Sequence, residues 1–249
     1  MRRHPIRIAA LVLTILLCAG TAVASGSSYP NAVNASGPIA YYRLDETSGT
    51  TAHTVSGSYN GTYTFSPNLG QTGLVHNTDQ APGFSGDDRV VANSLSRRTS
   101  WPGLTLEAWV LVTQNTQEEH IMVFSTWDGN QAPAILHDQP TKRFKYRDGY
   151  TTAYSTTIPQ IGKVYYVVAT IDTSNHGTLY VNGQAQAHFT TKKRPLSNGL
   201  FTIGADYDCH SCNGNPVVDT YWHGKIDEAA VYDRALSASE VTAHYQAGL

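Results

Sequence analysis

The sequence is poor in charged residues and in long apolar runs, and these two deficits exclude several classes of protein. Charged residues make up 14% of the 249 residues and the formal net charge is -2, so the chain lacks the basic excess typical of nucleic-acid binding. The short basic run Lys192–Arg194 is interpreted as a solvated loop. Beyond the N-terminal segment, no stretch approaches the roughly 18 to 20 apolar residues that a membrane-spanning helix requires. We therefore expect no nucleic-acid partner and no membrane span.

Cysteine is also scarce, and its placement limits the chemistry available. Apart from Cys18 near the N-terminus, the chain contains only Cys209 and Cys212. In a cytosolic α/β protein this spacing would suggest redox chemistry, but in an exported chain it predicts a small disulfide that stiffens one loop. A zinc site would need two further ligands, for which His210 and His223 are the nearby candidates, and this alternative stays open.

The N-terminal segment has the three parts of a secretory signal. Basic residues within 2–7 precede an apolar run over residues 8–19, and an Ala-Val-Ala sequence ends the segment at residue 24. We therefore predict a signal peptide over residues 1–24, which would remove Cys18, and a secreted, extracellular protein. Residues 25–35 are rich in Ser, Asn, Gly and Pro without periodicity, so they are interpreted as a flexible lead-in.

Most of the remaining chain has the alternation of β-strands. Leu104–Thr113 places aliphatic side chains on one face and Glu107 and Trp109 on the other, as expected of a strand at the core. Val164–Asp172 is almost wholly apolar, and Asn182-Gly183 between apolar runs is a strong hairpin signal. No segment before the C-terminus has a sustained helical period, so the sequence predicts an all-β protein with little helix.

The last segment of the chain combines a strand with a capped helix. Gly224–Tyr232 has apolar groups on both faces, and neighbouring Asp227 and Glu228 are expected to point to opposite faces of this strand. Ser237 and Glu240 then form the spacing of a capping box, which predicts the start of a short C-terminal helix.

This closing segment resembles the C-terminal signature of the laminin-G-like, concanavalin A-like jelly-roll family. Earlier segments follow in that family's order, and they are Ala40–Glu46, Phe84–Asp88, Leu104–Val110 and Leu179–Gly183. The resemblance implies a two-sheet antiparallel β-sandwich of the jelly-roll type over residues 36–249, with one short C-terminal helix. It does not imply one function, because this fold hosts lectins, adhesion modules and enzymes.

The resemblance also implies a structural calcium ion held by oxygen ligands from several loops. The candidate ligands are Asn60, Asp87 and Asp227. The chain departs from the family where an early-loop aspartate is usual, because His53 or Thr54 stands there, and imidazole is a poor calcium ligand. Equally, these aspartates could simply cap turns.

The acidic pattern of retaining glucanases of this fold is absent from the sequence. A polysaccharide lyase, which would need a base, an acid and a group that neutralises a uronate carboxylate, is the enzymatic alternative. Its candidate residues are His137, Arg143, Arg147, Tyr150 and Tyr154. A solvated strand face often carries such charges without catalysis, so this segment alone does not make the protein an enzyme.

For carbohydrate binding without catalysis, the candidates are aromatic side chains beside amides and carboxylates. They are Trp127, Asp128 and Asn130 in one polar loop, together with Tyr207 and Trp222. Trp127 could equally serve packing, and Trp222, which immediately precedes the closing strand, is a strong candidate for packing at the edge of the sandwich. We interpret the chain as a monomeric, secreted, non-catalytic domain that binds a polysaccharide or other glycan. A uronate lyase and a protein-recognising adhesion module remain the alternatives.

Overall fold

The computed structural model describes residues 28–76, 79–125, 133–192, 195, 199–208 and 217–249, with side chains left undescribed over 207–208 and 217–219. The predicted signal peptide, the loop with Trp127, Asp128 and Asn130, and the predicted Cys209–Cys212 disulfide lie outside the described residues. In the part of the chain that is described, no helix is long and apolar enough to cross a membrane.

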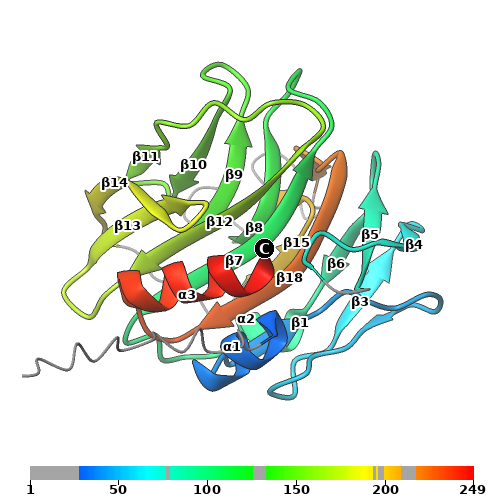
Figure 1. The fold of residues 1–249 in the computed structure, drawn as a ribbon, viewed down its shortest axis with the longest axis horizontal. Coiled ribbons are helices and arrows are strands. Elements are labelled where there is room, and N and C mark those ends of the chain that lie inside the picture. The colour runs from blue at the N-terminus through cyan, green and yellow to red at the C-terminus, as the bar shows by residue number, and fades with distance from the viewer. Residues whose placement is uncertain (1–27, 77–78, 126–132, 193–194, 196–198, 209–216) are drawn as a thin grey trace, which may run out of the picture.

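Two eight-stranded antiparallel sheets pack face to face (Figure 1). Sheet A contains, in spatial order, β14 (Gln184–Thr190), β13 (His176–Val181), β12 (Lys163–Ile171), β7 (Leu104–Val112), β18 (Gly224–Tyr232), β5 (Gln80–Phe84) and β4 (Asn68–Thr72), with β1 (Ala40–Tyr42) also paired to β18. Sheet B contains β11 (Thr152–Tyr154), β10 (Arg143–Arg147), β9 (Ala134–Asp138), β8 (Glu119–Ser125), β15 (Leu200–Ile203), β6 (Arg89–Val91), β3 (Gly61–Thr64) and β2 (Thr51–Ala52). A separate ribbon pairs β16 (Asp206–Asp208) with β17 (Val217–Asp219), and the helices are α1 (Tyr29–Ala35), α2 (Asn93–Ser96) and α3 (Ala238–Gly248). The predicted two-sheet jelly-roll architecture is confirmed.

The main core lies between the two sheets, and β7 shows how the sequence builds it. Leu106 and Ala108 are buried in this core, whereas Glu107 and Trp109 project from the other face of sheet A. Helices α1 and α3 lie side by side across that second face (Figure 1). They form a smaller core in which the ring of Tyr245 stacks on Trp109 at 5.8 Å between centroids. Sheet A is therefore buried on both faces where the helices cover it.

Two local predictions are confirmed in atomic detail. The β13–β14 hairpin turns at Asn182 and Gly183, both of which have the positive φ angles (52° and 75°) that a type I′ turn requires. At the start of α3, the Ser237 hydroxyl accepts a hydrogen bond from the Glu240 N–H, and the Glu240 carboxylate accepts one from the Ser237 N–H, which completes the capping box.

The prediction that residues 25–35 form a flexible lead-in is wrong for Tyr29–Ala35, which form helix α1. The described chain consequently contains three helices where the sequence predicted one. Seven residues are too few to show a helical period, and isolated helices of this length are unstable in water. The helix forms because Tyr29 and Val33 are buried against sheet A and Pro30 favours its first turn.

Candidate functional site

The strand β18 contains a β-bulge at its two acidic residues. Asp227 pairs with Trp109 and Ala230 with Glu107, so β18 has one more residue than β7 across this interval. Glu228 takes the left-handed conformation, with φ of 53°. The bulge breaks the strict alternation of side chains, and the prediction that Asp227 and Glu228 point apart is therefore wrong.

The bulge brings Asp227 and Glu228 together with Asp79, and one carboxylate oxygen from each lies within 4.8 Å of the others. The guanidinium of Arg43 lies 2.6 Å from Asp79 and 3.4 Å from Glu228, measured between nitrogen and oxygen. The hydroxyl of Tyr41 donates a hydrogen bond to Glu228. Three buried carboxyl groups thus share one fully charged partner, and we call Asp79, Asp227 and Glu228 the carboxylate cluster.

Burial raises the pKa of both acidic residues on β18. For Glu228 the hydrogen bond to Asp79 and the charge of Asp227 add to the effect of burial, and its pKa rises to about 10. The pKa of Asp227 also lies well above its usual value, although the Leu74 N–H, which donates to its Oδ2 at 2.7 Å, opposes that shift. Without a bound metal ion, at least Glu228 therefore keeps its proton at neutral pH.

The donor chemistry of the carboxylate cluster fits a hard cation such as calcium. All three side chains offer oxygen, which is the ligand that calcium prefers, and Oδ2 of Asp79 and Oδ1 of Asp227 are buried without a hydrogen-bond partner. The other two predicted ligands are placed differently. Asn60 accepts hydrogen bonds from the backbone N–H and hydroxyl of Thr54, and Asp87 is exposed in a turn.

A second group of polar side chains lies on the outer face of sheet B, opposite the main core. On β10, Phe144 and Tyr146 point into that core, so Arg143, Lys145 and Arg147 share the outer face. We call this polar surface, together with the carboxylates beside it, the sheet-B face. Its residues are Glu118, His120, Asp138, Lys145, Arg147, Tyr154 and Asp206.

The cations of the sheet-B face are already paired with carboxylates. Lys145 Nζ lies 2.8 Å from both Glu118 and Asp138, and Arg147 lies 3.4 Å from Glu118 and 2.9 Å from Asp206. Burial lowers the pKa of Lys145, but the hydrogen bonds to Asp138 and Glu118 outweigh burial and raise it overall. These side chains form a fixed ionic network rather than a row of unpaired positive charges.

One histidine belongs to the sheet-B face. His120 is completely buried, with its Nδ1 2.7 Å from the Thr220 hydroxyl and its Nε2 3.7 Å from Asp206. Burial lowers the pKa of His120 to about 4, with Asp206 opposing the shift and Arg147 favouring it. The imidazole is therefore uncharged at neutral pH and inaccessible to a ligand.

The structure separates the residues predicted for a lyase. Tyr154 lies opposite Lys145 on β11, with its ring 5.8 Å from the ammonium and its side chain accessible, the residue being 40% exposed. Tyr150, in the turn before β11, is 63% exposed. His137 is fully buried on the core side of β9, where its ring lies 6.1 Å from that of Phe144. The predicted base, His137, and the exposed Tyr154 thus lie on opposite faces of sheet B.

Two predicted sugar-binding residues can also be placed. Trp222 is fully buried in the main core and donates its indole N–H to the Lys225 carbonyl at 3.1 Å, so its ring is not accessible for stacking on a sugar. Tyr207 belongs to β16, which packs against β8 at the sheet-B face, but its side chain lies outside the described part. Sequence reasoning did not assign His120, Asp138 or Asp206 to a site, because each comes from a different segment and none has a local motif.

Comparisons with known proteins agree with this architecture. A family model described as the Concanavalin A-like lectin/glucanases superfamily matches residues 84–242. No curated protein matches the chain.

Solved structures with the same architecture include domain 4 of AbnA, an extracellular GH43 arabinanase from Geobacillus stearothermophilus, in complex with arabinotriose. It superposes with a TM-score of 0.64 at 16% identity, and the match covers 84% of this chain and 98% of that domain. A mutant of Trypanosoma rangeli sialidase with trans-sialidase activity superposes with a TM-score of 0.62 at 17% identity, covering 86% of this chain. The chain spans only 33% of that sialidase.

Proposed function

Because the chain belongs to the concanavalin A-like lectin/glucanase superfamily, we propose that it binds a polysaccharide outside the cell without cleaving it. The likeness to a sugar-bound arabinanase domain over nearly the whole of that domain supports a glycan ligand. The matching part of the sialidase is one third of that enzyme, so the comparison does not support an enzymatic activity for this chain.

The observation that carries the proposal is the pairing of exposed tyrosines with a fixed ionic network on the sheet-B face. Tyr154 offers an accessible ring next to Lys145, and Tyr150 offers a second ring in the adjoining turn. Aromatic rings stack on the apolar faces of sugars, and charged side chains already held by their partners can bind hydroxyl groups without being ordered on binding. This combination favours a saccharide ligand.

The same geometry disfavours a lyase. Lys145 and Arg147 are bound to carboxylates, so neither is free to neutralise a uronate. His137 and His120, the histidines on either face of this part of sheet B, are both completely buried. A base that abstracts a sugar proton must come within hydrogen-bond reach of it, and these imidazoles do not.

The proposal is tested by electrophoresis of the purified protein in gels that contain arabinan, galactan, xylan or pectate. We expect retardation by at least one neutral polysaccharide and a clearly weaker retardation of Tyr154→Ala. Tyr154→Phe, which keeps the exposed ring, is the control and should preserve the retardation. Trp127→Ala tests the separate sequence-based prediction for the undescribed loop. The absence of retardation in every gel would overturn the proposal, and a rise in absorbance near 235 nm with pectate would instead support a lyase.

A calcium ion held by Asp79, Asp227 and Glu228 is part of this proposal, in a structural role that fixes the bulge of β18. It is supported by the oxygen donors and the two unpartnered carboxylate oxygens. Export and the Cys209–Cys212 disulfide remain predictions from the sequence.

A further inference from the structure

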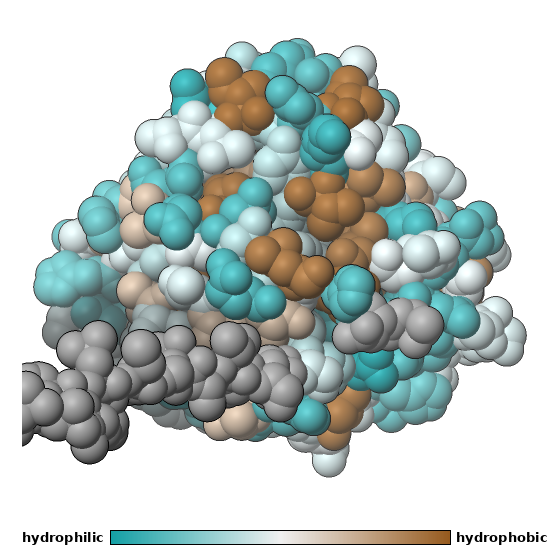
Figure 2. Space-filling view, viewed as in Figure 1, coloured by the Kyte–Doolittle hydropathy of each residue, from teal (hydrophilic) through white to brown (hydrophobic). Residues whose placement is uncertain are grey.

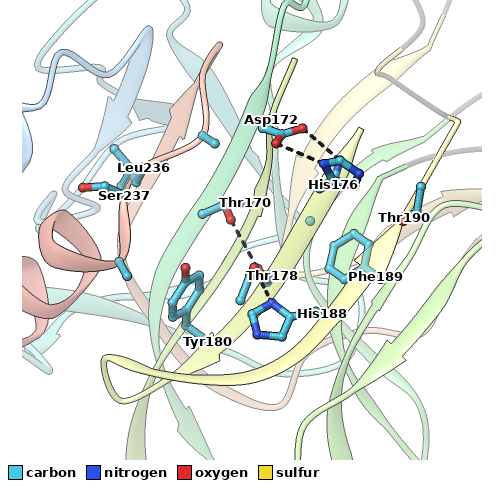
Figure 3. Close-up of a pocket in the computed structure, with 13 residues that line it drawn as sticks. Thr170, Asp172, His176, Thr178, Tyr180, His188, Phe189, Thr190, Leu236 and Ser237 are labelled. Atoms are coloured by element: carbon cyan, nitrogen blue, oxygen red, sulfur yellow. Dashed lines mark hydrogen bonds and ion pairs between the residues drawn. The ribbon is translucent and has the colours of Figure 1, made fainter. Parts of the chain in front are cut away.

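A groove of about 730 Å³ lies on the outer face of sheet A, and Figure 3 shows the residues that line it. Its floor is formed by β12, β13 and β14, and one wall is the connection from β18 to α3 around Leu236 and Ser237. Small-molecule sites typically occupy about 300 to 1,000 Å³, so the groove has the size of a ligand site. We call it the sheet-A groove.

The floor of the sheet-A groove is a row of hydroxyl and imidazole groups. Thr170, Thr178 and His188 are direct neighbours across three strands and project from the same face. The Thr178 hydroxyl and His188 Nδ1 lie 3.0 Å apart, and this contact fixes the ring, as Figure 3 shows. The hydroxyl of Tyr180 lies beside them. Each of these groups can both donate and accept a hydrogen bond, provided that the imidazole is neutral.

The upper end of the groove in Figure 3 carries Asp172 and His176. Asp172 Oδ1 accepts hydrogen bonds from the backbone N–H of Ser174 and of His176, and its Oδ2 lies 3.5 Å from His176 Nδ1. Among the described residues that line the groove, Asp172 is the one with a full formal charge. An anionic ligand would be repelled there, whereas the hydroxyl groups of a neutral sugar could bind a carboxylate.

The wall of the groove is held rigidly. The Thr105 hydroxyl donates to the Arg234 carbonyl at 2.8 Å and accepts from the Leu236 N–H at 3.0 Å. The capping box of α3 fixes Ser237 immediately afterwards. A site formed by strands and a capped helix end needs little rearrangement to bind its ligand.

The lining of the groove extends to Thr190, near the edge of the sandwich where sheet A contacts sheet B. Thr151, next to Tyr150, donates its hydroxyl to the carbonyl of Thr190, which lines the groove, at 2.6 Å. Strands β11 and β14, the edge strands of the two sheets, are in contact there. A long chain bound at the exposed tyrosines could therefore pass close to the groove.

We propose that the sheet-A groove is a second saccharide-binding site, for a neutral sugar, which works together with the sheet-B face on one polysaccharide chain. The inference rests on the proposed function for the identity of its ligand. Two sites on one polymer make the second binding event intramolecular and raise the overall affinity without any new contact.

The test compares His188→Ala, Tyr154→Ala and the double variant by electrophoresis in gels that contain arabinan, galactan, xylan or pectate. Both side chains are exposed, so both variants should fold, which thermal melting would verify. His76→Ala removes an exposed histidine outside the groove and is the matched control. We expect each single variant to raise the apparent dissociation constant at least about a hundredfold, the lower end of a bivalent effect, and the double variant to abolish retardation.

The outcomes separate the two proposals. If His188→Ala binds like the wild type while Tyr154→Ala does not bind, the second site is overturned and the proposed function stands. If His188→Ala loses binding while Tyr154→Ala keeps it, the groove stands and the sheet-B face is overturned as the binding surface. Retardation by pectate alone would overturn the neutral ligand that the charge of the groove indicates.

Discussion

The imidazole of His244, in the C-terminal helix, lies 3.0 Å from the carboxylate of Glu107 in the middle of sheet A. Tyr29 from α1 and Tyr166 from β12 donate their hydroxyl groups to the same carboxylate, each at 2.7 Å. Two strands and two helices thus meet at one buried charge. This contact explains why α1 and α3, both short, are held firmly on the sheet.

Replacing His244 with alanine is expected to lower the free energy of unfolding by about 3 to 5 kcal/mol, because Glu107 would become a buried charge without a cationic partner. Urea unfolding at pH 6 measures this change. His76→Ala, at an exposed histidine, is the control and should change stability by less than about 0.5 kcal/mol. A similarly small effect of His244→Ala would contradict the importance of the pair.

The pair should also make stability depend on pH. Burial lowers the pKa of His244, but the hydrogen bond and charge of Glu107 outweigh burial and raise it above 6.5. The stabilisation from His244 is therefore complete below pH 6.5 and is lost as pH rises through its pKa in the folded protein. Burial raises the pKa of Glu107, but the hydrogen bonds from His244, Tyr166 and Tyr29 outweigh burial and lower this pKa below 4.5. The stabilisation from the Glu107 carboxylate is therefore lost only as pH falls through that lowered pKa. Melting temperatures of wild type and His244→Ala should differ most between pH 4.5 and 6.5.

The carboxylate cluster predicts a calcium response that grows with pH. The folded pKa of Glu228, about 10, lies above its ordinary value of 4.5, so without a cation stability should fall progressively as pH rises between these values. A bound calcium ion would replace the protons and restore stability at neutral and alkaline pH. We expect added calcium to raise the melting temperature more at pH 8.5 than at pH 5, and EDTA to reverse the rise.

Asp227→Asn should abolish that calcium response, whereas Asp87→Asn, which changes an exposed aspartate outside the cluster, should preserve it. An unchanged melting temperature with calcium at both pH values would show that protons and Arg43 balance the charge of the cluster without a metal ion.

A side chain at Gly183, in the hairpin between β13 and β14, should lower the free energy of unfolding. Gly183 has φ of 75°, and an added Cβ would also lie 3.0 Å from the ring of Tyr245. Gly162 has a similar φ of 79° with open space around it. Left-handed backbone costs a non-glycine residue about 1 to 2 kcal/mol, so Gly162→Ala measures that cost alone. Gly183→Ala should lose more in urea unfolding, and an equal loss would show that Tyr245 moves aside freely.

Helix α1 should contribute measurably to the stability of the fold. Tyr29→Phe removes one hydrogen bond to the Glu107 carboxylate and should cost about 1.5 to 3 kcal/mol, the usual range for a bond to a charged group. Tyr154→Phe removes a hydroxyl from an exposed tyrosine on sheet B and serves as the control. Chemical denaturation followed by circular dichroism measures both. No change for Tyr29→Phe would show that the hydrogen bond to Glu107 does not contribute to the stability that α1 provides.

The sequence by itself determined the features that depend on neighbouring residues. The alternation of Leu106 and Glu107 in β7, the Asn182-Gly183 turn and the capping box at Ser237 all appear in the structure where they were predicted. Strand alternation, φ preferences and caps act over a few residues, so local pattern is sufficient to reveal them.

Only the tertiary structure decided what lies together from distant segments. The convergence of Asp79 with Asp227 and Glu228 depends on a bulge whose extra residue is visible only against β7. Helix α1 depends on Glu107, 78 residues away from Tyr29, because its own seven residues bury too little to be stable alone. The sheet-B face and the sheet-A groove likewise depend on the register of several strands, which no local pattern specifies.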